Sequence, residues 1–127
     1  MKKIFLYIFL SLFLNSSANA EWTKVSTTSA GNIYYVDFEN IRTEGNLIYY
    51  WEFMKYAAPL DDGTLSHKIY QVLDCNRFAI KPIRFIFYTD KNGSSDPDSQ
   101  KSLINEWETY PPDSVAMDSS KKLCKNI

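Results

Sequence analysis

The residues of this chain with the clearest chemical potential are its two cysteines, Cys75 and Cys124. In an oxidising compartment, a small domain normally joins an even pair of cysteines in a disulfide. A metal site and a reactive thiol are the alternatives. However, two cysteines and the single histidine, His67, fall short of the four ligands of a structural zinc site unless carboxylates assist. We therefore predict a Cys75–Cys124 disulfide, with no metal and no cofactor.

The sequence offers little for enzymatic chemistry. Hydrolysis needs a nucleophile with a base and an orienting group, or a metal-activated water. No Gly-x-Ser-x-Gly, His-Glu-x-x-His or glycine-rich phosphate motif occurs. His67 adjoins a polar loop, so we expect it at a strand edge on the surface. The acid pairs Asp61-Asp62 and Glu106/Glu108 are expected to be solvated. The chain is predicted not to be an enzyme and to have no catalytic residues.

Aspartates between residues 90 and 98 invite a comparison with a calcium-binding loop. Such a loop needs glycine at its sixth position and glutamate at its twelfth. Counted from Asp90, Gly93 is fourth and Lys101 is twelfth. The segment is therefore predicted to be a solvated hairpin loop.

One basic cluster, Arg77, Lys81 and Arg84, lies in a stretch without acidic residues from position 75 to 88. Such a cluster can bind an acidic partner, for example a heparin-like chain or an acidic protein surface. It can equally be a charged strand edge that prevents aggregation. Both interpretations remain open, and the cluster is the candidate partner-binding site.

The first twenty residues have the three parts of an export signal. Lys2 and Lys3 precede an apolar run from Ile4 to Leu14, and Ala18 and Ala20 supply the small residues of a cleavage site. The run is about 11 residues, roughly half the length that crosses a bilayer. We predict a signal peptide over residues 1–20, cleavage after Ala20, and no transmembrane segment thereafter. The leader lacks a cysteine for a lipid anchor, which favours the periplasm over the cell surface or secretion.

Residues 21–127 suit a single domain. Without Lys2 and Lys3, 12 of the 14 basic residues remain against 15 acidic ones, a net charge of −3. A charge this small gives no general attraction to nucleic acid or anionic membrane, and no nucleic-acid partner is expected.

Short aromatic-rich segments bounded by turn residues predict a β-rich fold. The predicted strands are 22–26, 32–37, 47–56, 67–75 and 83–89, with a hairpin tip at 44–46, an exposed loop at 90–100 and a return to the sheet within 103–110. Pro82 is expected to interrupt the chain before the strand that carries Ile83, Phe85 and Phe87 on one face.

The strand Leu47–Tyr56 is apolar on both faces apart from Glu52, so it is predicted to be central and covered on both sides. The tail from Asp113 is predicted to be a helix that turns Met117, Ser120, Lys121 and Cys124 toward the sheet. This helix is short. Aromatic side chains it leaves uncovered could form an interface, including a homodimer.

The order of several motifs resembles the surface-adhesin protein E family of small exported bacterial domains. The resemblance is carried by YYVD (34–37), GNLIYYW (45–51), IYQVLDC (69–75), FYTDKNG (87–93) and WETYPPDSVAMDSSKKLC (107–124). It implies an antiparallel sheet whose concave face is tied to the terminal helix by the disulfide. It also implies binding of host extracellular-matrix or plasma proteins.

The predicted fold class is thus α+β: a single antiparallel sheet of about five to six strands, with a C-terminal helix packed on one face and tied by one disulfide. The predicted function is that of an exported, non-enzymatic binding protein of adhesin type. The alternative is a soluble periplasmic envelope or housekeeping protein with no host partner.

Overall fold

The computed structural model describes residues 20–97, 99–102 and 106–125. The predicted leader and Ala18 lie outside the described residues, which begin at Ala20. Within them, no helical segment combines the length and the hydropathy that crossing a bilayer requires.

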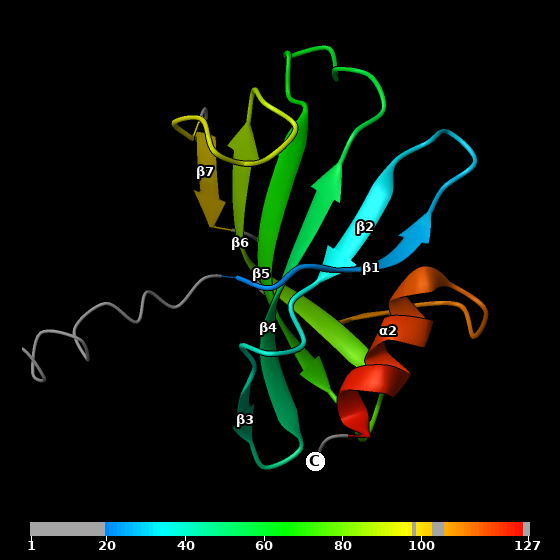
Figure 1. Ribbon diagram of the computed structural model, residues 1–127. Helices are drawn as coiled ribbons and strands as arrows, with labels where there is room; N and C mark the ends of the chain where they lie inside the picture. The colour runs from blue at the N-terminus through cyan, green and yellow to red at the C-terminus, as the bar shows by residue number, and fades with distance from the viewer. Residues whose placement is uncertain (1–19, 98, 103–105, 126–127) are drawn as a thin grey trace, which may run out of the picture.

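The chain forms one twisted antiparallel sheet followed by a helix (Figure 1). The elements are β1 (Thr23–Thr27), β2 (Ile33–Val36), β3 (Arg42–Glu44), β4 (Leu47–Lys55), β5 (Ser66–Asp74), β6 (Ala79–Tyr88), β7 (Ser99–Ser102), β8 (Glu108–Thr109) and α2 (Val115–Cys124). Six strands follow one another in the order β1-β2-β4-β5-β6-β7, while β3 pairs with β4 and β8 with β6. The predicted fold class is confirmed.

Turn chemistry sets the β3–β4 hairpin. Glu44 pairs with Leu47, so Gly45 and Asn46 form a two-residue loop. Gly45 has φ of +59°, a conformation that glycine adopts without the penalty of a Cβ. The tip predicted at residues 44–46 is confirmed.

The core lies where α2 meets the sheet. Leu123 is fully buried and belongs to a cluster with residues of four strands: Val36, Ile48, Tyr50, Leu73 and Ile80. A disulfide joins Cys75, directly after β5, to Cys124, with 5.8 Å between the Cα atoms. The predicted disulfide is confirmed, and it holds the last turn of α2 against the sheet.

The predicted inner face of the helix is confirmed for Ser120 and Cys124 and is wrong for Lys121. Lys121 is exposed, and the buried residues of α2 are Ser119, Ser120 and Leu123. The sheet-facing set therefore follows the i, i+3, i+4, i+7 spacing from Ala116. The physical reason is that Leu123, the largest aliphatic side chain of the last turn, gains most from burial.

Two strand predictions also need correction. β6 begins at Ala79 and runs through Pro82, because a bulge at Ile83 shifts the register between Tyr70 and Gln71 of β5. Ile83 therefore does not share the regular alternation of Phe85 and Phe87. β7 begins inside the loop predicted over residues 90–100 and ends two residues after it, so the end of that loop is a strand. The return to the sheet predicted within residues 103–110 is confirmed by β8.

Candidate functional site

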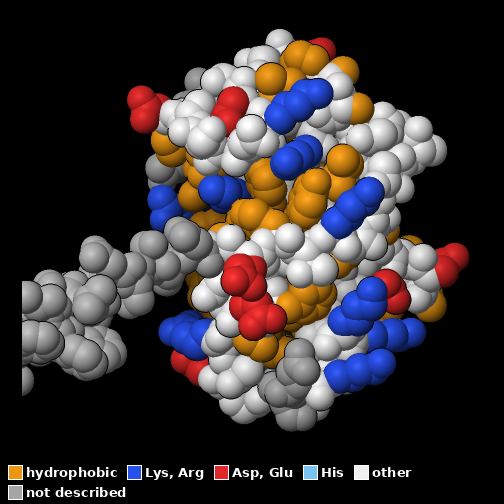
Figure 2. All heavy atoms as spheres, in the orientation of Figure 1, with side chains coloured by type: hydrophobic (Ala, Val, Ile, Leu, Met, Phe, Trp, Pro, Cys, Tyr) orange, Lys and Arg blue, Asp and Glu red, His pale blue; other side chains and the backbone are white. Residues whose placement is uncertain are grey.

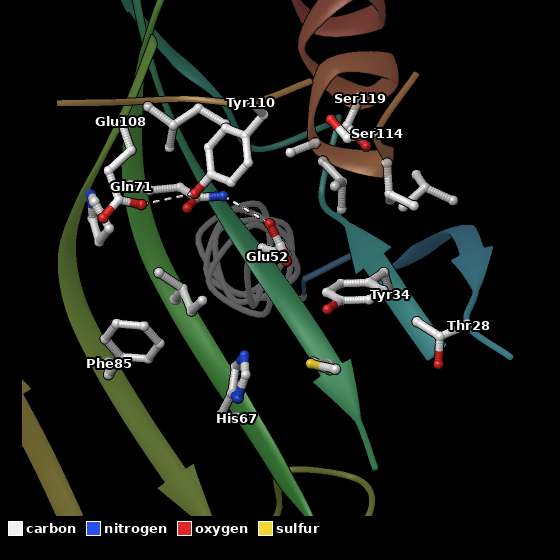
Figure 3. Close-up of a pocket in the computed structure, with 18 residues that line it drawn as sticks. Thr28, Tyr34, Glu52, His67, Gln71, Phe85, Glu108, Tyr110, Ser114 and Ser119 are labelled. Carbon is white, nitrogen blue, oxygen red and sulfur yellow. Dashed lines mark hydrogen bonds between the residues drawn. The ribbon is translucent and has the colours of Figure 1, made fainter. Parts of the chain in front are cut away.

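A cavity of about 650 Å³ lies between the sheet and the start of α2 (Figure 3). Its floor is one face of β2, β4, β5 and β6, which we call the cavity face. Its other walls come from β1, β8, the segment leading into α2 and the first turns of α2 itself. The lining residues are Val25, Thr28, Tyr34, Val36, Glu52, Met54, His67, Ile69, Gln71, Ile80, Pro82, Phe85, Glu108, Tyr110, Ser114, Val115, Ala116 and Ser119.

Strand alternation builds the floor. Side chains two positions apart share a face of a sheet, so Glu52 and Met54 of β4 face the cavity together with Ile69 and His67, their register partners on β5. The bulge in β6 lets both Pro82 and Phe85 face the cavity, although they are three residues apart. The floor is thus mainly apolar, with polar groups at a few fixed points.

Glu52 is the carboxylate at the centre of the floor. Its Oε2 accepts a hydrogen bond of 2.8 Å from Nε2 of Gln71, which also donates to the Tyr50 hydroxyl at 2.9 Å. Burial raises the pKa of Glu52, and the hydrogen bond from Gln71 partly opposes that shift. Gln71 therefore fixes the orientation of a carboxylate that has lost much of its hydration.

His67 lies at the other end of the floor and is 7% exposed. The prediction of a surface histidine at a strand edge is wrong, because β5 is a central strand and the ring faces the cavity. Nδ1 is 2.6 Å from the Tyr56 hydroxyl, and the rings of Phe85 and Phe87 lie edge-on to the imidazole. Burial lowers the pKa of His67 to about 4, so the ring is neutral at pH 7.

Two tyrosines of the cavity, Tyr34 of the floor and Tyr110 of the wall, flank Glu52. Tyr110 donates to Oε2 of Glu108 at 3.2 Å, and Figure 3 shows its ring beside Glu52, with Tyr34 on the other side of the carboxylate. Burial, with the Glu108 carboxylate nearby, raises the pKa of Tyr110 to about 12. Burial and the nearby Glu52 carboxylate also raise the pKa of Tyr34, so both tyrosines carry neutral hydroxyl groups at pH 7.

The opposite face of the sheet, which we call the outer face, is basic and aromatic. Lys68 Nζ lies 5.8 Å from the ring centre of Phe53 and 4.9 Å from that of Tyr88. Arg42 lies 4.2 Å above Tyr49. Figure 2 looks onto this face, where Lys and Arg side chains are interleaved with hydrophobic ones over the upper part of the sheet.

Two of the three residues of the predicted basic cluster lie over the ring of one tryptophan. Arg77 and Lys81 lie 4.9 Å and 4.8 Å from the ring centre of Trp107. Arg77 also pairs with Asp74 at 2.9 Å. The bulge in β6 places Arg84 on the same face as Lys81, since their partners on β5 are two residues apart. Lys81 and Arg84 are thus part of the outer face.

Other predicted features have simple structural roles. Asp90 accepts hydrogen bonds from the backbone amides of Asn92, Ser94 and Ser95, so it organises its own loop. No group of three or more His, Cys, Asp or Glu side chains within the described part of the chain is arranged to hold a metal ion.

Sequence reasoning missed the cavity. A charged residue within an otherwise apolar strand face was its one visible signal, and that residue is Glu52. The short terminal helix was expected to leave part of one sheet face uncovered, but the sequence did not show that the uncovered part would be a cavity around Glu52.

Comparison with known proteins places the chain in a family. The fold is similar to crystal form II of Haemophilus influenzae protein E, with a TM-score of 0.65 and 17% identity, covering 87% of this chain and 92% of that one. It is also similar to protein E from non-typeable Haemophilus influenzae, with a TM-score of 0.62, 17% identity, and coverage of 87% and 80%. No curated protein matches the sequence significantly. The profile of surface-adhesin protein E matches residues 22–125, and the chain therefore belongs to the surface-adhesin protein E family.

Proposed function

We propose that the protein is an exported, non-enzymatic adhesin whose outer face binds an acidic region of a host extracellular-matrix or plasma protein. Membership of a family of surface adhesins supports a role in binding at the cell surface. The observation that carries the choice of surface is the set of cations held over aromatic rings on one face of the sheet.

Contact with aromatic rings restricts the side chains of these cations before a partner binds. Lys55 lies 5.3 Å from the ring centre of Tyr35, and Lys68 and Arg42 are held in the same manner over other rings. A cation above a ring keeps its charge near solvent while its side chain loses freedom before the partner arrives. The entropy lost on binding is then smaller. Such a surface suits carboxylate-rich or sulfated partners.

The predicted cluster offers a direct test on immobilised heparin and on a panel of matrix and plasma proteins. We expect the R77S/K81S/R84S variant to bind at least about tenfold more weakly. A second variant, K81S/R84S, keeps the ion pair between Arg77 and Asp74 and separates lost binding from lost stability. The control, K121S/K122S/K125S, removes the same charge from exposed positions of α2 and the residue after it. Equal binding by cluster and control variants would refute the choice of surface.

A soluble periplasmic protein with no host partner is the second candidate. The cavity favours it, because a concave space of this size suits a small molecule better than a protein surface. Antibody labelling of intact cells and fractionation of the envelope separate the two functions. An adhesin is labelled on intact cells, whereas a periplasmic protein is released only when the outer membrane is opened. Sequencing the N-terminus of the same material tests the predicted cleavage after Ala20.

A second copy of the chain is the remaining partner predicted from the sheet aromatics. On the outer face, Tyr49 and Trp51 are partly exposed, whereas Phe53 is covered by Trp22 and Tyr35. Sedimentation over a range of concentrations tests this prediction. A dimer that the variant W51S dissociates would support it, and a monomer at high concentration would count against it.

A further inference from the structure

We propose that the cavity binds a small organic cation with an apolar body, either a protonated amine or a quaternary ammonium compound. The site lies on the cavity face, opposite to the outer face. The inference goes beyond the proposed function and does not depend on it.

The dimensions of the cavity are those of a small-molecule site. Its volume of about 650 Å³ lies in the range of roughly 300–1,000 Å³ that ligand pockets occupy. Aliphatic and aromatic side chains make up most of the floor, among them Met54, Ile69, Ile80 and Phe85. These surfaces fit the apolar body of a ligand.

The charges in the cavity select the sign of the ligand. Glu52 and Glu108 line it, whereas no lysine or arginine does among the described lining residues, and His67 is neutral. An anion would meet two carboxylates without any compensating cation, and burying such a charge is strongly unfavourable. A neutral ligand would displace water from Glu52 and offer no counter-charge. A cation avoids both costs.

The carboxylate is held ready for such a cation. Among the described residues, the only hydrogen bond that the Glu52 carboxylate accepts comes from Gln71. A carboxylate has about four acceptor sites, so most of those of Glu52, which lines the cavity, have no partner among the described residues. Because Gln71 is itself anchored on the Tyr50 hydroxyl, the carboxylate is positioned before a ligand arrives.

Aromatic rings provide the second element of cation recognition. Tyr34 and Tyr110 lie on either side of Glu52 (Figure 3). Ring faces attract ammonium groups, and the attraction is strongest where water is excluded. A carboxylate between two tyrosine rings recognises the charge and the methyl or methylene groups around it together.

The imidazole of His67 is an independent sign of a ligand. The side chain is more than nine-tenths buried, yet its Nε2 has no hydrogen-bond partner among the described residues. Figure 3 shows the ring directed toward the middle of the cavity. Buried polar atoms in folded proteins are normally hydrogen-bonded. Nε2 therefore marks a position for a second polar group of the ligand, at a distance from the ammonium group.

Three probes of equal length test the sign of the charge: 4-phenylbutylamine, 4-phenylbutanol and 4-phenylbutyrate, titrated calorimetrically into the purified protein at pH 7. We expect one saturable site for the amine, at least about tenfold weaker binding of the alcohol, and no binding of the carboxylate. Phenethylamine, a shorter amine, allows for a poor fit of length. The amine should also raise the melting temperature.

The matched variants are Glu52→Gln and Glu44→Gln. Glu44 is exposed in β3, so its replacement makes the same charge change away from the cavity. We expect E52Q to bind the amine at least about tenfold more weakly while its binding of the alcohol stays the same. E44Q should bind all probes like the unmodified protein. Amide shifts in the NMR spectrum should locate the amine among the residues of β4 and β5 that line the cavity.

Several outcomes would overturn the proposal. These are equal binding of the amine and the alcohol, tighter binding of the carboxylate, or amine shifts confined to the outer face. Absence of saturable binding by both amines up to about 10 mM would do so as well. Should E52Q fail to fold, the comparison of the three probes on the unmodified protein still decides the sign of the charge.

Discussion

The ionised carboxylate of Glu52 serves the proposed binding of a cation, but its burial lowers the stability of the fold. Burial raises its pKa above the unfolded value, so the ionised group destabilises the fold above that unfolded value and the penalty disappears as the pH falls. We expect Glu52→Gln to raise the free energy of unfolding at pH 7 and to change it little near pH 3. Urea denaturation at both pH values measures this. A variant that is less stable than the unmodified protein at pH 7 would show that the ionised carboxylate is compensated.

His67 has the opposite effect on the pH dependence of stability, because it destabilises the fold as the pH falls. Its pKa of about 4 lies below the usual 6.5, so the unfolded chain binds the proton more readily as the pH falls from 6.5 toward 4. The protein should lose about 3 kcal/mol of stability over this range through His67 alone. Replacing it with phenylalanine should remove that part of the pH dependence, as measured by urea denaturation at pH 7 and 4.5. Parallel pH profiles for the two proteins would contradict the assignment.

The sequence predicts which face of β5 a residue lies on, but not whether that residue is buried. Alternation along β5 already put Ile69, Gln71 and Leu73 on one face, and the same alternation includes His67. The polar loop next to His67 does not expose the ring, which is buried. Burial depends on what packs above a strand, and the turns and helix that cover this face come from distant parts of the chain.

At the scale of elements, one side chain dominates the contact of α2. Leu123 is fully buried, whereas Met117 is partly exposed. Leu123→Ala should lower the free energy of unfolding by about 3 kcal/mol, through lost burial and a residual cavity. Met117→Ala, the control on the same helix, should cost less than about 1 kcal/mol. Equal losses in urea denaturation would favour the inner face predicted from the sequence.

Most elements could be predicted because their signals are local. The strand β4 follows from its dense aromatic residues, and the hairpin before it follows from Gly45. The first residue of β6 could not be predicted, because a proline such as Pro82 normally interrupts the hydrogen bonds between strands. The bulge next to the pair of Pro82 and Gln71 accommodates it here. β7 has the composition of a loop, and its strand conformation depends on the edge that β6 offers.

At the scale of the molecule, the disulfide closes a long loop. Cys75 and Cys124 are 49 residues apart, and a cross-link of this span stabilises a fold by about 4 kcal/mol in the chain-entropy description. The C75S/C124S variant should lose about that much, measured by urea denaturation against the oxidised protein. The reductant dithiothreitol should lower the stability of the unmodified protein and leave the variant unchanged. Equal stability of the two proteins would mean that packing of Leu123 alone holds the helix.

The two faces of the sheet are expected to act independently, because a layer of packed strands separates the outer face from the cavity. Distant sites without shared contacts normally have additive effects. K81S/R84S should therefore weaken heparin binding and leave 4-phenylbutylamine binding unchanged, whereas E52Q should do the reverse. Salt gives a further distinction, since screening weakens contacts between exposed charges far more than contacts in a buried cavity. Raising the ionic strength should release heparin and preserve the amine complex. If each variant altered both activities, the strands between the faces would transmit the effect, and the cavity would have to be regarded as a regulator of adhesion.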